Sequence, residues 1–277
     1  MDFTFQSRYG FEDLVKIVAL LRAPGGCPWD REQTHRSIRA NFIEETYEAV
    51  EAIDTDDPDL LREELGDVLL QVAMHARMEE ESGRFTIGDV IDGICKKLVV
   101  RHPHVFGDVQ AGTSEEVLRN WDAIKRRTKK QETFTETLES VPRVLPALMR
   151  SEKLQHRAAR AGFDWPDAQG PLAKIREELG ELVQAADAGS GAACREELGD
   201  LLFACVNAAR HLGVEPEEAL SAACDKFTAR FASCERQAAE QGEALSALSP
   251  EQLDALWQNA KQGLQSEPVR GNEGKNA

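Results

Sequence analysis

The stretch Arg62-Glu63-Glu64-Leu65-Gly66-Asp67 recurs without change as Arg195-Glu196-Glu197-Leu198-Gly199-Asp200, and an apolar run follows each copy. A second acidic motif precedes each copy, Glu44-Glu45-Thr46-Tyr47-Glu48 in the first half and Glu177-Glu178-Leu179-Gly180-Glu181 in the second. Both halves therefore read E-E-x-x-E, fifteen residues, then E-x-x-D, with an offset of 133 residues at all four acidic positions. This agreement indicates two copies of one module.

The repeat continues downstream of the acidic motifs. A K-x-x-x-R pattern and then a W-x-x-x-K pattern follow in both halves, at Lys97, Arg101, Trp121 and Lys125 and at Lys226, Arg230, Trp257 and Lys261. The offset becomes 129 and then 136 residues, so only the connecting loops changed length. We predict a first module at residues 1–135, a second module at residues 136–265 and a disordered tail at residues 266–277.

Helical periodicity runs through nearly the whole chain, and we find no convincing strand alternation. Asp57-Pro58 and Ser249-Pro250 each place a capping residue before a proline, which is typical of a helix start. Residues 83–86 and 102–113 are rich in turn-forming residues and predict connections. The expected fold is all-α, with two tandem helical-bundle modules.

The chain carries 33 basic and 49 acidic residues, a net charge of -16. Such a surface repels a nucleic-acid polymer, whereas a small anionic substrate could bind through a cation; the charge could also serve solubility alone. None of the six cysteines forms a C-x-x-C pair, which favours buried thiols in a reducing compartment. With neither a signal peptide nor an apolar run of membrane-spanning length, we expect a cytoplasmic protein without a membrane partner.

The paired acidic motifs predict a metal site. Residues three apart lie on one face of a helix, so Glu178 projects with Glu181, and Glu197 with Asp200. The intervening Gly189-Ser190-Gly191 predicts a turn that can bring both pairs together. Carboxylates at close range repel one another unless a cation lies among them, and hard oxygen ligands favour Mg²⁺, with Mn²⁺ as a substitute. The corresponding acids of the first half are Glu45, Glu48, Glu64 and Asp67.

Each of these motifs has a simpler interpretation as well. Acidic runs on helices are usually solvated, and a duplication could preserve a purely structural acid cluster. Lys226 and Arg230 share a helix face and could hold phosphate oxygens, or they could be ordinary surface cations. Trp257 could stack on a base while Lys261 reaches a phosphate, or the tryptophan could belong to the core.

Gly66 and Gly199 strengthen the case for a functional site. A glycine inside a helix costs on the order of 1 kcal/mol relative to alanine. Finding one at the same register in both copies indicates the close approach of another backbone or of a ligand. A di-iron carboxylate site is a weaker alternative, because the one E-x-x-H motif runs from Glu32 to His35, near a predicted loop.

With these motifs the chain resembles the MazG family of nucleoside triphosphate pyrophosphohydrolases in its two-module form. The segments that carry the resemblance are the acidic pairs, Gly26-Cys27-Pro28-Trp29-Asp30, Arg101-His102-Pro103-His104-Val105-Phe106 and Gly162-Phe163-Asp164-Trp165. The resemblance reaches to about residue 264 and implies an all-α homodimer of the all-alpha NTP pyrophosphatase type. It implies magnesium-dependent hydrolysis of NTPs and dNTPs by water at the α-phosphorus, which yields the monophosphate and pyrophosphate.

The resemblance also implies that the second module carries the main activity. Transferred to this chain, Glu178, Glu181, Glu197 and Asp200 would bind magnesium, and Glu177 or a ligand carboxylate would orient the attacking water. The nucleotide site would be lined by Lys174, Glu177, Arg195, Glu196, Lys226, Arg230, Trp257 and Lys261. The first module keeps its four acids but has Asn41 where the offset places Lys174, so we rank that site second.

Two other functions stay open at this point. The chain could be a narrower phosphohydrolase that acts on dUTP, phosphoribosyl-ATP or an alarmone. It could also be a non-catalytic interaction protein whose acids bind a structural or sensory metal.

Overall fold

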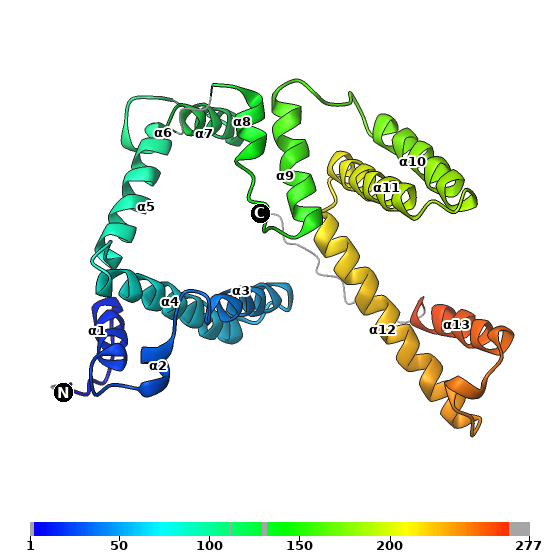
Figure 1. Cartoon of the computed structure of the whole chain (residues 1–277), viewed down its shortest axis with the longest axis horizontal. Helices are drawn as coiled ribbons and strands as arrows, with labels where there is room; N and C mark the ends of the chain where they lie inside the picture. Colours follow the sequence, from blue (N-terminus) through cyan, green and yellow to red (C-terminus); the bar gives the residue numbers. More distant parts are fainter. Residues whose placement is uncertain (1–2, 111, 129–131, 266–277) are drawn as a thin grey trace. The chain divides into compact units, whose positions relative to one another are not determined.

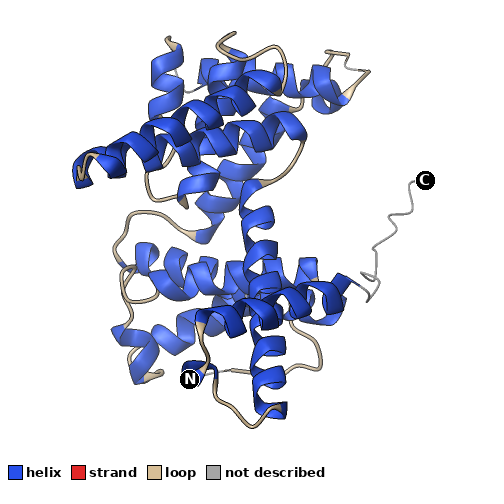
Figure 2. Cartoon of the chain, turned by 90° about the vertical axis from the view of Figure 1, so that its right-hand side faces the viewer, coloured by secondary structure: helices blue, strands red, loops and turns tan. Residues whose placement is uncertain are grey.

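The computed structural model describes residues 3–110, 112–128 and 132–265, and the predicted tail at 266–277 and the side chain of Lys125 lie outside the described part. Every regular element in these ranges is a helix, as Figure 2 shows, so the predicted all-α class is confirmed. The chain divides into two compact units, residues 1–128 and 129–277. None of the helices described is both long and apolar enough to cross a membrane.

The first unit is built around a helical hairpin. Its elements are α1 (Phe11–Arg22), α2 (Pro28–Glu32), α3 (Arg39–Asp54), α4 (Pro58–Glu81), α5 (Ile87–Arg101), α6 (Pro103–Phe106) and α7 (Ser114–Thr128). Helix α3 packs along α4, and α1 packs against α4 as well. Val18 of α1, Ile38, and Met74 and Met78 of α4 meet in the buried core of this unit.

The second unit repeats the hairpin. Its elements are α8 (Phe134–Glu139), α9 (Ala147–Arg160), α10 (Gln169–Asp187), α11 (Gly191–Leu212), α12 (Pro216–Glu240), the 3₁₀ turn η1 (Leu245–Ala247) and α13 (Pro250–Gln265). Helices α10 and α11 form the hairpin, and α9 packs against α11. Helix α13 packs against the far half of α12, away from the hairpin, over a separate core that includes Cys234, Ala238 and Leu256 (Figure 1). The module boundary predicted at residue 135 falls within α8.

Local signals explain where these helices begin and end. Asp57 Oδ1 accepts two hydrogen bonds of 3.0 Å from backbone N–H groups in the first turn of α4, which makes it the predicted cap. Gly189 adopts a φ of 68° and Ser190 caps α11, so the predicted turn between α10 and α11 is confirmed. The connection predicted at 102–113 also contains the short helix α6, which Pro103 opens.

The close approach expected at Gly66 and Gly199 is not made within one copy of the chain. Apart from the neighbouring residues and the backbone of the same helix, a Cβ atom built at either glycine would meet no atom within 4 Å among the described residues. Both positions therefore border open space. That space can take a ligand or a second chain, so the expected close approach to these glycines stays a prediction.

Candidate metal and nucleotide site

Helices α10 and α11 gather acidic side chains in the second unit. Glu178 comes from α10, and Glu197 and Asp200 come from α11. Each of these three residues offers a carboxylate oxygen, and the three oxygens lie within 4.8 Å of one another. Such an all-oxygen donor set suits a hard divalent cation. The hairpin thus brings together acids that are 19 to 22 residues apart in the sequence.

The charges of this acid group are poorly compensated. Partial burial raises the pKa of Glu197, and the carboxylates of Glu181 and Glu178 raise that pKa further. The fourth predicted acid, Glu181, is therefore close enough to repel the group. Glu178 is only 4% exposed, so its charge has little access to solvent. A cation among these oxygens would remove the repulsion.

Lys174 lies one turn before this group on α10. Its Nζ atom is 2.5 Å from Glu178 Oε1 and 2.9 Å from Glu177 Oε1. These two carboxylates, Glu178 first, hold the pKa of Lys174 well above its usual range. Sequence reasoning placed Lys174 on the nucleotide; in the structure it also neutralises the most buried acid of the site.

The first unit holds a similar but not identical acid group. Glu45, Glu48 and Glu64 each offer an oxygen, and these oxygens again lie within 4.8 Å of one another. Burial and then Asp67 raise the pKa of Glu45. Asn41 stands where the second unit has Lys174, and Glu45 Oε1 accepts a hydrogen bond of 3.5 Å from the Gln71 amide. The first group therefore has no cation at the position that corresponds to Lys174.

The predicted phosphate-binding cations lie on other helices. Lys226 and Arg230 belong to α12, and Trp257 and Lys261 belong to α13. These two helices pack against each other rather than along α10, as Figure 1 shows. A single copy of the chain thus does not bring the acid group and these four residues into one site.

Arg230 and Trp257 instead contact each other. The Arg230 guanidinium lies 5.8 Å from the Trp257 ring centroid, and the Phe227 ring lies 5.3 Å from it. Trp257 also packs against the core of α12 and α13, so its interpretation as a core residue holds as well. The same pairing recurs in the first unit, where Arg101 lies 5.1 Å from the centroid of Trp121. Sequence analysis treated the two motifs separately and missed that they form a cation–π pair.

A cavity of about 490 Å³ lies between α9, α11 and the Gly162–Trp165 loop. Its polar lining includes Gln155, Asp164, Asn207 and Arg210. Of these, only Asp164 stood out in the sequence, as part of a segment that carries the family resemblance. Asn207 and Arg210 could have been found, because they continue the face of α11 that begins with Asp200. Gln155 carried no such signal, since its place depends on how α9 packs.

An all-helical module that gathers carboxylates from both helices of a hairpin defines a class of α-helical protein with a candidate divalent-cation site. The family model described as the MazG nucleotide pyrophosphohydrolase domain matches residues 33–106 and 168–234. Each matched segment contains one E-E-x-x-E and one E-x-x-D motif. The chain belongs to this family.

Two relatives align over nearly their whole length. The nucleoside triphosphate pyrophosphohydrolase/pyrophosphatase MazG of Thermotoga maritima is 47% identical over 253 residues, 91% of this chain and 96% of the relative. The nucleoside triphosphate pyrophosphohydrolase of Escherichia coli K12 is 45% identical over 251 residues, 90% of this chain and 95% of the relative. The similarity therefore covers both units.

Proposed function

We propose that this chain hydrolyses nucleoside and deoxynucleoside triphosphates to the monophosphate and pyrophosphate, chiefly in its second module. The observation that carries the proposal is the group of convergent carboxylates on α10 and α11. The names of the relatives from Thermotoga maritima and Escherichia coli support the same reaction. Water attack at the α-phosphorus is the step that yields these two products.

Magnesium is the proposed cofactor, with manganese as a substitute. Its ligands would be Glu178, Glu181, Glu197 and Asp200. The donor chemistry fits, because all four proposed ligands are carboxylates, and burial first and then repulsion by Glu181 and Glu178 raise the pKa of Glu197. When bound, the ion would neutralise phosphate oxygens and polarise the phosphorus.

The neighbouring side chains then have separate tasks. Lys174 can exchange its ion pair with Glu178 for a phosphate oxygen, since a cation at the acids would replace the charge that Lys174 now supplies. Glu177 is free to orient the attacking water once Lys174 has turned away. Arg195 and Glu196 begin the E-x-x-D segment of α11 and would line the same nucleotide site.

Arg230 is suited to a phosphate. Its guanidinium rests on the Trp257 ring, which fixes its direction, and its Nε is buried without a hydrogen-bond partner among the described residues. Lys226 lies one turn earlier on α12, and Lys261 follows Trp257 by one turn on α13. We assign these residues to the phosphates of the nucleotide, with Trp257 as the support of Arg230.

A homodimer is the proposed working form, and a second copy would bring its cations to the acids of the first. Large apolar side chains on α10, α11 and α12 are between 47% and 57% exposed, which a stable single copy would not leave uncovered: Leu179, Val183, Leu198, Leu202, Leu220 and Phe227. The open space beside Gly199 lies on the same hairpin. A positively charged pair on α12 complements the acids electrostatically.

The reaction is tested by incubating the purified chain with Mg²⁺ and dGTP and assaying pyrophosphate. We expect pyrophosphate from the wild type and none above background from Glu178→Ala. A panel of all common NTPs and dNTPs, with dUTP included, separates a general enzyme from a narrow one. Near-normal turnover by Glu178→Ala would refute the assignment of the site.

The shared site is tested by mixing two inactive variants, Glu178→Ala and Arg230→Ala. If one copy supplies acids and the other supplies cations, half of the randomly mixed dimers have one intact site, so about a quarter of wild-type activity returns. If each copy is complete by itself, every mixed dimer is inactive. Absence of recovery in dimers shown to exchange subunits would contradict the proposal.

A further inference from the structure

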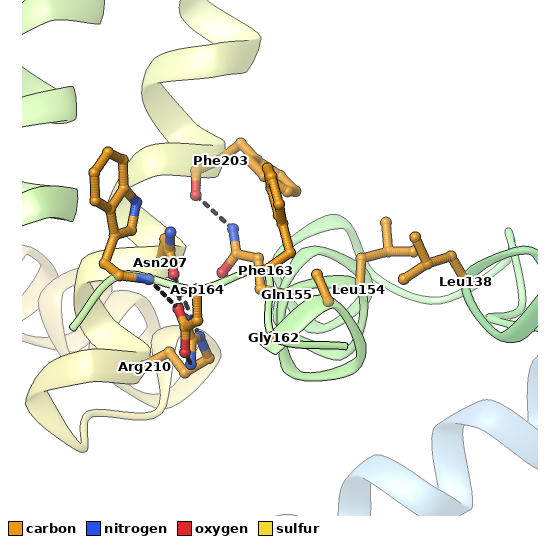
Figure 3. Close-up of a pocket in the computed structure, with 11 residues that line it drawn as sticks. Leu138, Leu154, Gln155, Gly162, Phe163, Asp164, Phe203, Asn207 and Arg210 are labelled. Carbon is orange, nitrogen blue, oxygen red and sulfur yellow. Dashed lines mark hydrogen bonds and ion pairs between the residues drawn. The ribbon is translucent and has the colours of Figure 1, made fainter. Parts of the chain in front are cut away.

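The walls of the cavity between α9, α11 and the Gly162–Trp165 loop are aromatic and aliphatic. Phe163, Trp165 and Phe203 are 83%, 48% and 42% exposed, so large ring surfaces remain uncovered beside the cavity. Leu138 and Leu154 line it as well, as Figure 3 shows. Walls of this kind bind a flat aromatic group by stacking and by burial of its faces.

The indole ring of Trp165 packs against a fixed part of this wall, the backbone at Gly170. A Cβ atom built at Gly170 would lie 2.5 Å from Cδ2 and Cε3 of Trp165, far inside contact distance. The ring therefore rests directly on the backbone of the first turn of α10. Glycine at this position is required by the tryptophan, which makes the orientation of the ring a built feature of the cavity.

The cavity also offers one hydrogen-bond acceptor and one donor. Gln155 is 5% exposed, and its Nε2 donates to the Phe203 carbonyl at 2.8 Å, which fixes the amide orientation. Its Oε1 is buried and has no partner among the described residues. Asn207 accepts from Arg210 Nη2 at 2.8 Å through Oδ1, so its amide nitrogen faces away from that bond (Figure 3).

The charges beside the cavity cancel. Arg210 Nη1 donates to Asp164 Oδ2 at 2.9 Å, and its Nη2 contacts the other oxygen of Asp164. His211 Nε2 lies 3.0 Å from the same carboxylate. The guanidinium is thus already paired, and nothing else in the lining is charged. The cavity suits a neutral ring with polar edge atoms and does not suit a phosphate.

The cavity lies beside the acid group on the same helix. Phe203 and Asn207 continue the face of α11 that carries Asp200, because they follow it by three and seven residues. With a rise of 1.5 Å per residue, Asn207 lies about 10 Å along the helix axis from Asp200. A ribose and a base can cover this separation when the α-phosphate is held at the acids.

We propose that this cavity binds the nucleobase of the substrate, with stacking on Trp165 and edge contacts from Gln155 and Asn207. The inference rests on the proposed pyrophosphohydrolase function and adds a base subsite to it. It also assigns the stacking role to Trp165, whereas the sequence motifs had left Trp257 open between base stacking and a place in the core.

The test compares dNTPs with a base-free deoxyribose triphosphate as substrates. Trp165→Ala removes the stacking ring, and Gly170→Ala displaces it while adding a good helix former. We expect each variant to raise KM for dNTPs about 10-fold and to leave KM for the base-free triphosphate unchanged. Trp29→Ala is the matched control, because it removes an exposed tryptophan of the first unit, and we expect no change.

Three results would overturn the inference. These are an unchanged KM for dNTPs, an equal loss for the base-free substrate, or selective loss in Trp257→Ala instead of Trp165→Ala. Calorimetry with dNTPs and with the base-free triphosphate measures the contribution of the base to binding without turnover. If the wild type released no pyrophosphate, the proposed function would fail, and the binding comparison would still decide where the base lies.

Discussion

The two units share the same acidic hairpin but differ in what surrounds it. On the repeated helix, Leu70 and Met74 of the first unit correspond by the 133-residue offset to Phe203 and Asn207 of the second. Met74 is buried in a core with Val18, whereas Asn207 lines a cavity. The duplication therefore preserved the acidic pattern in both units, but the position that lines a cavity in the second unit holds a core methionine in the first.

The local cation is the other difference. Lys174 pairs with Glu178 in the second unit, and Asn41 occupies the corresponding position of the first. The second group therefore has a cation paired with one of its acids, and the first group has a neutral amide side chain at that position. The same acidic motif therefore has different surroundings in the two units, and the motif alone does not make the two sites equivalent.

The largest expected effect comes from the acids themselves. Asp200→Ala should lower pyrophosphate release at least about 100-fold, since loss of a ligand should exceed the usual effect of losing a ligand's support. Glu45→Ala in the first unit should change it less than about 3-fold, because Asn41 replaces the lysine there and Met74 fills the place of Asn207. Steady-state assays of pyrophosphate release compare the two variants, and circular dichroism checks that both are folded. Equal losses of activity in the two variants would contradict the proposal that the second unit carries most of the activity.

A stability difference should follow from the packed core. Met74→Ala creates a void in the first unit and should lower the free energy of unfolding by about 2–5 kcal/mol. Asn207→Ala, at the corresponding position of the second unit, borders an existing cavity and should cost less than about 1 kcal/mol. Urea unfolding of both variants gives the comparison. A larger loss for Asn207→Ala would show that the cavity is not open space in solution.

Exchange of the local cation should shift nucleotide affinity. Lys174→Asn should raise KM about 10-fold with a smaller change in kcat, because a charge-assisted hydrogen bond to phosphate contributes about 1.5–3 kcal/mol. Asn41→Lys, made together with Asp200→Ala, should increase nucleotide binding by the first unit in calorimetry. If Lys174→Asn leaves KM unchanged, the lysine serves Glu178 alone.

The smallest expected effect is a change in how the stability of the fold depends on pH. Hydrogen bonds from Arg210 hold the pKa of Asp164 at about 2, below the ordinary 3.8, with help from His211 and the Trp165 backbone N–H. Because the folded pKa is the lower one, this carboxylate stabilises the fold above pH 4, and the contribution is lost as pH falls toward 2. Asp164→Asn should remove about 1 kcal/mol at neutral pH and flatten the stability profile between pH 4 and 2. An unchanged profile would mean that the Arg210 pairing is not maintained in solution.

The sequence by itself determined the helices, the duplication and the faces that carry the acids. These follow from local rules, because periodicity places residues three apart on one side and the Gly189-Ser190 turn folds one helix back on the other. The family resemblance followed from the same motifs and is confirmed. The sequence motifs predict four acids in the second module, and carboxylate oxygens of three of them lie within 4.8 Å of one another.

Only the tertiary structure decided how the remaining residues are grouped. The stacking of Arg230 on Trp257 joins two helices, and their spacing in the sequence does not encode how those helices cross. The cavity depends on α9 and the Gly162–Trp165 loop meeting α11, which places Gln155 beside residues about 50 positions away. Side-chain patterns record which face of a helix is buried, but they do not record which neighbour fills it, and that neighbour decides whether Met74 closes a core or Asn207 borders a binding site.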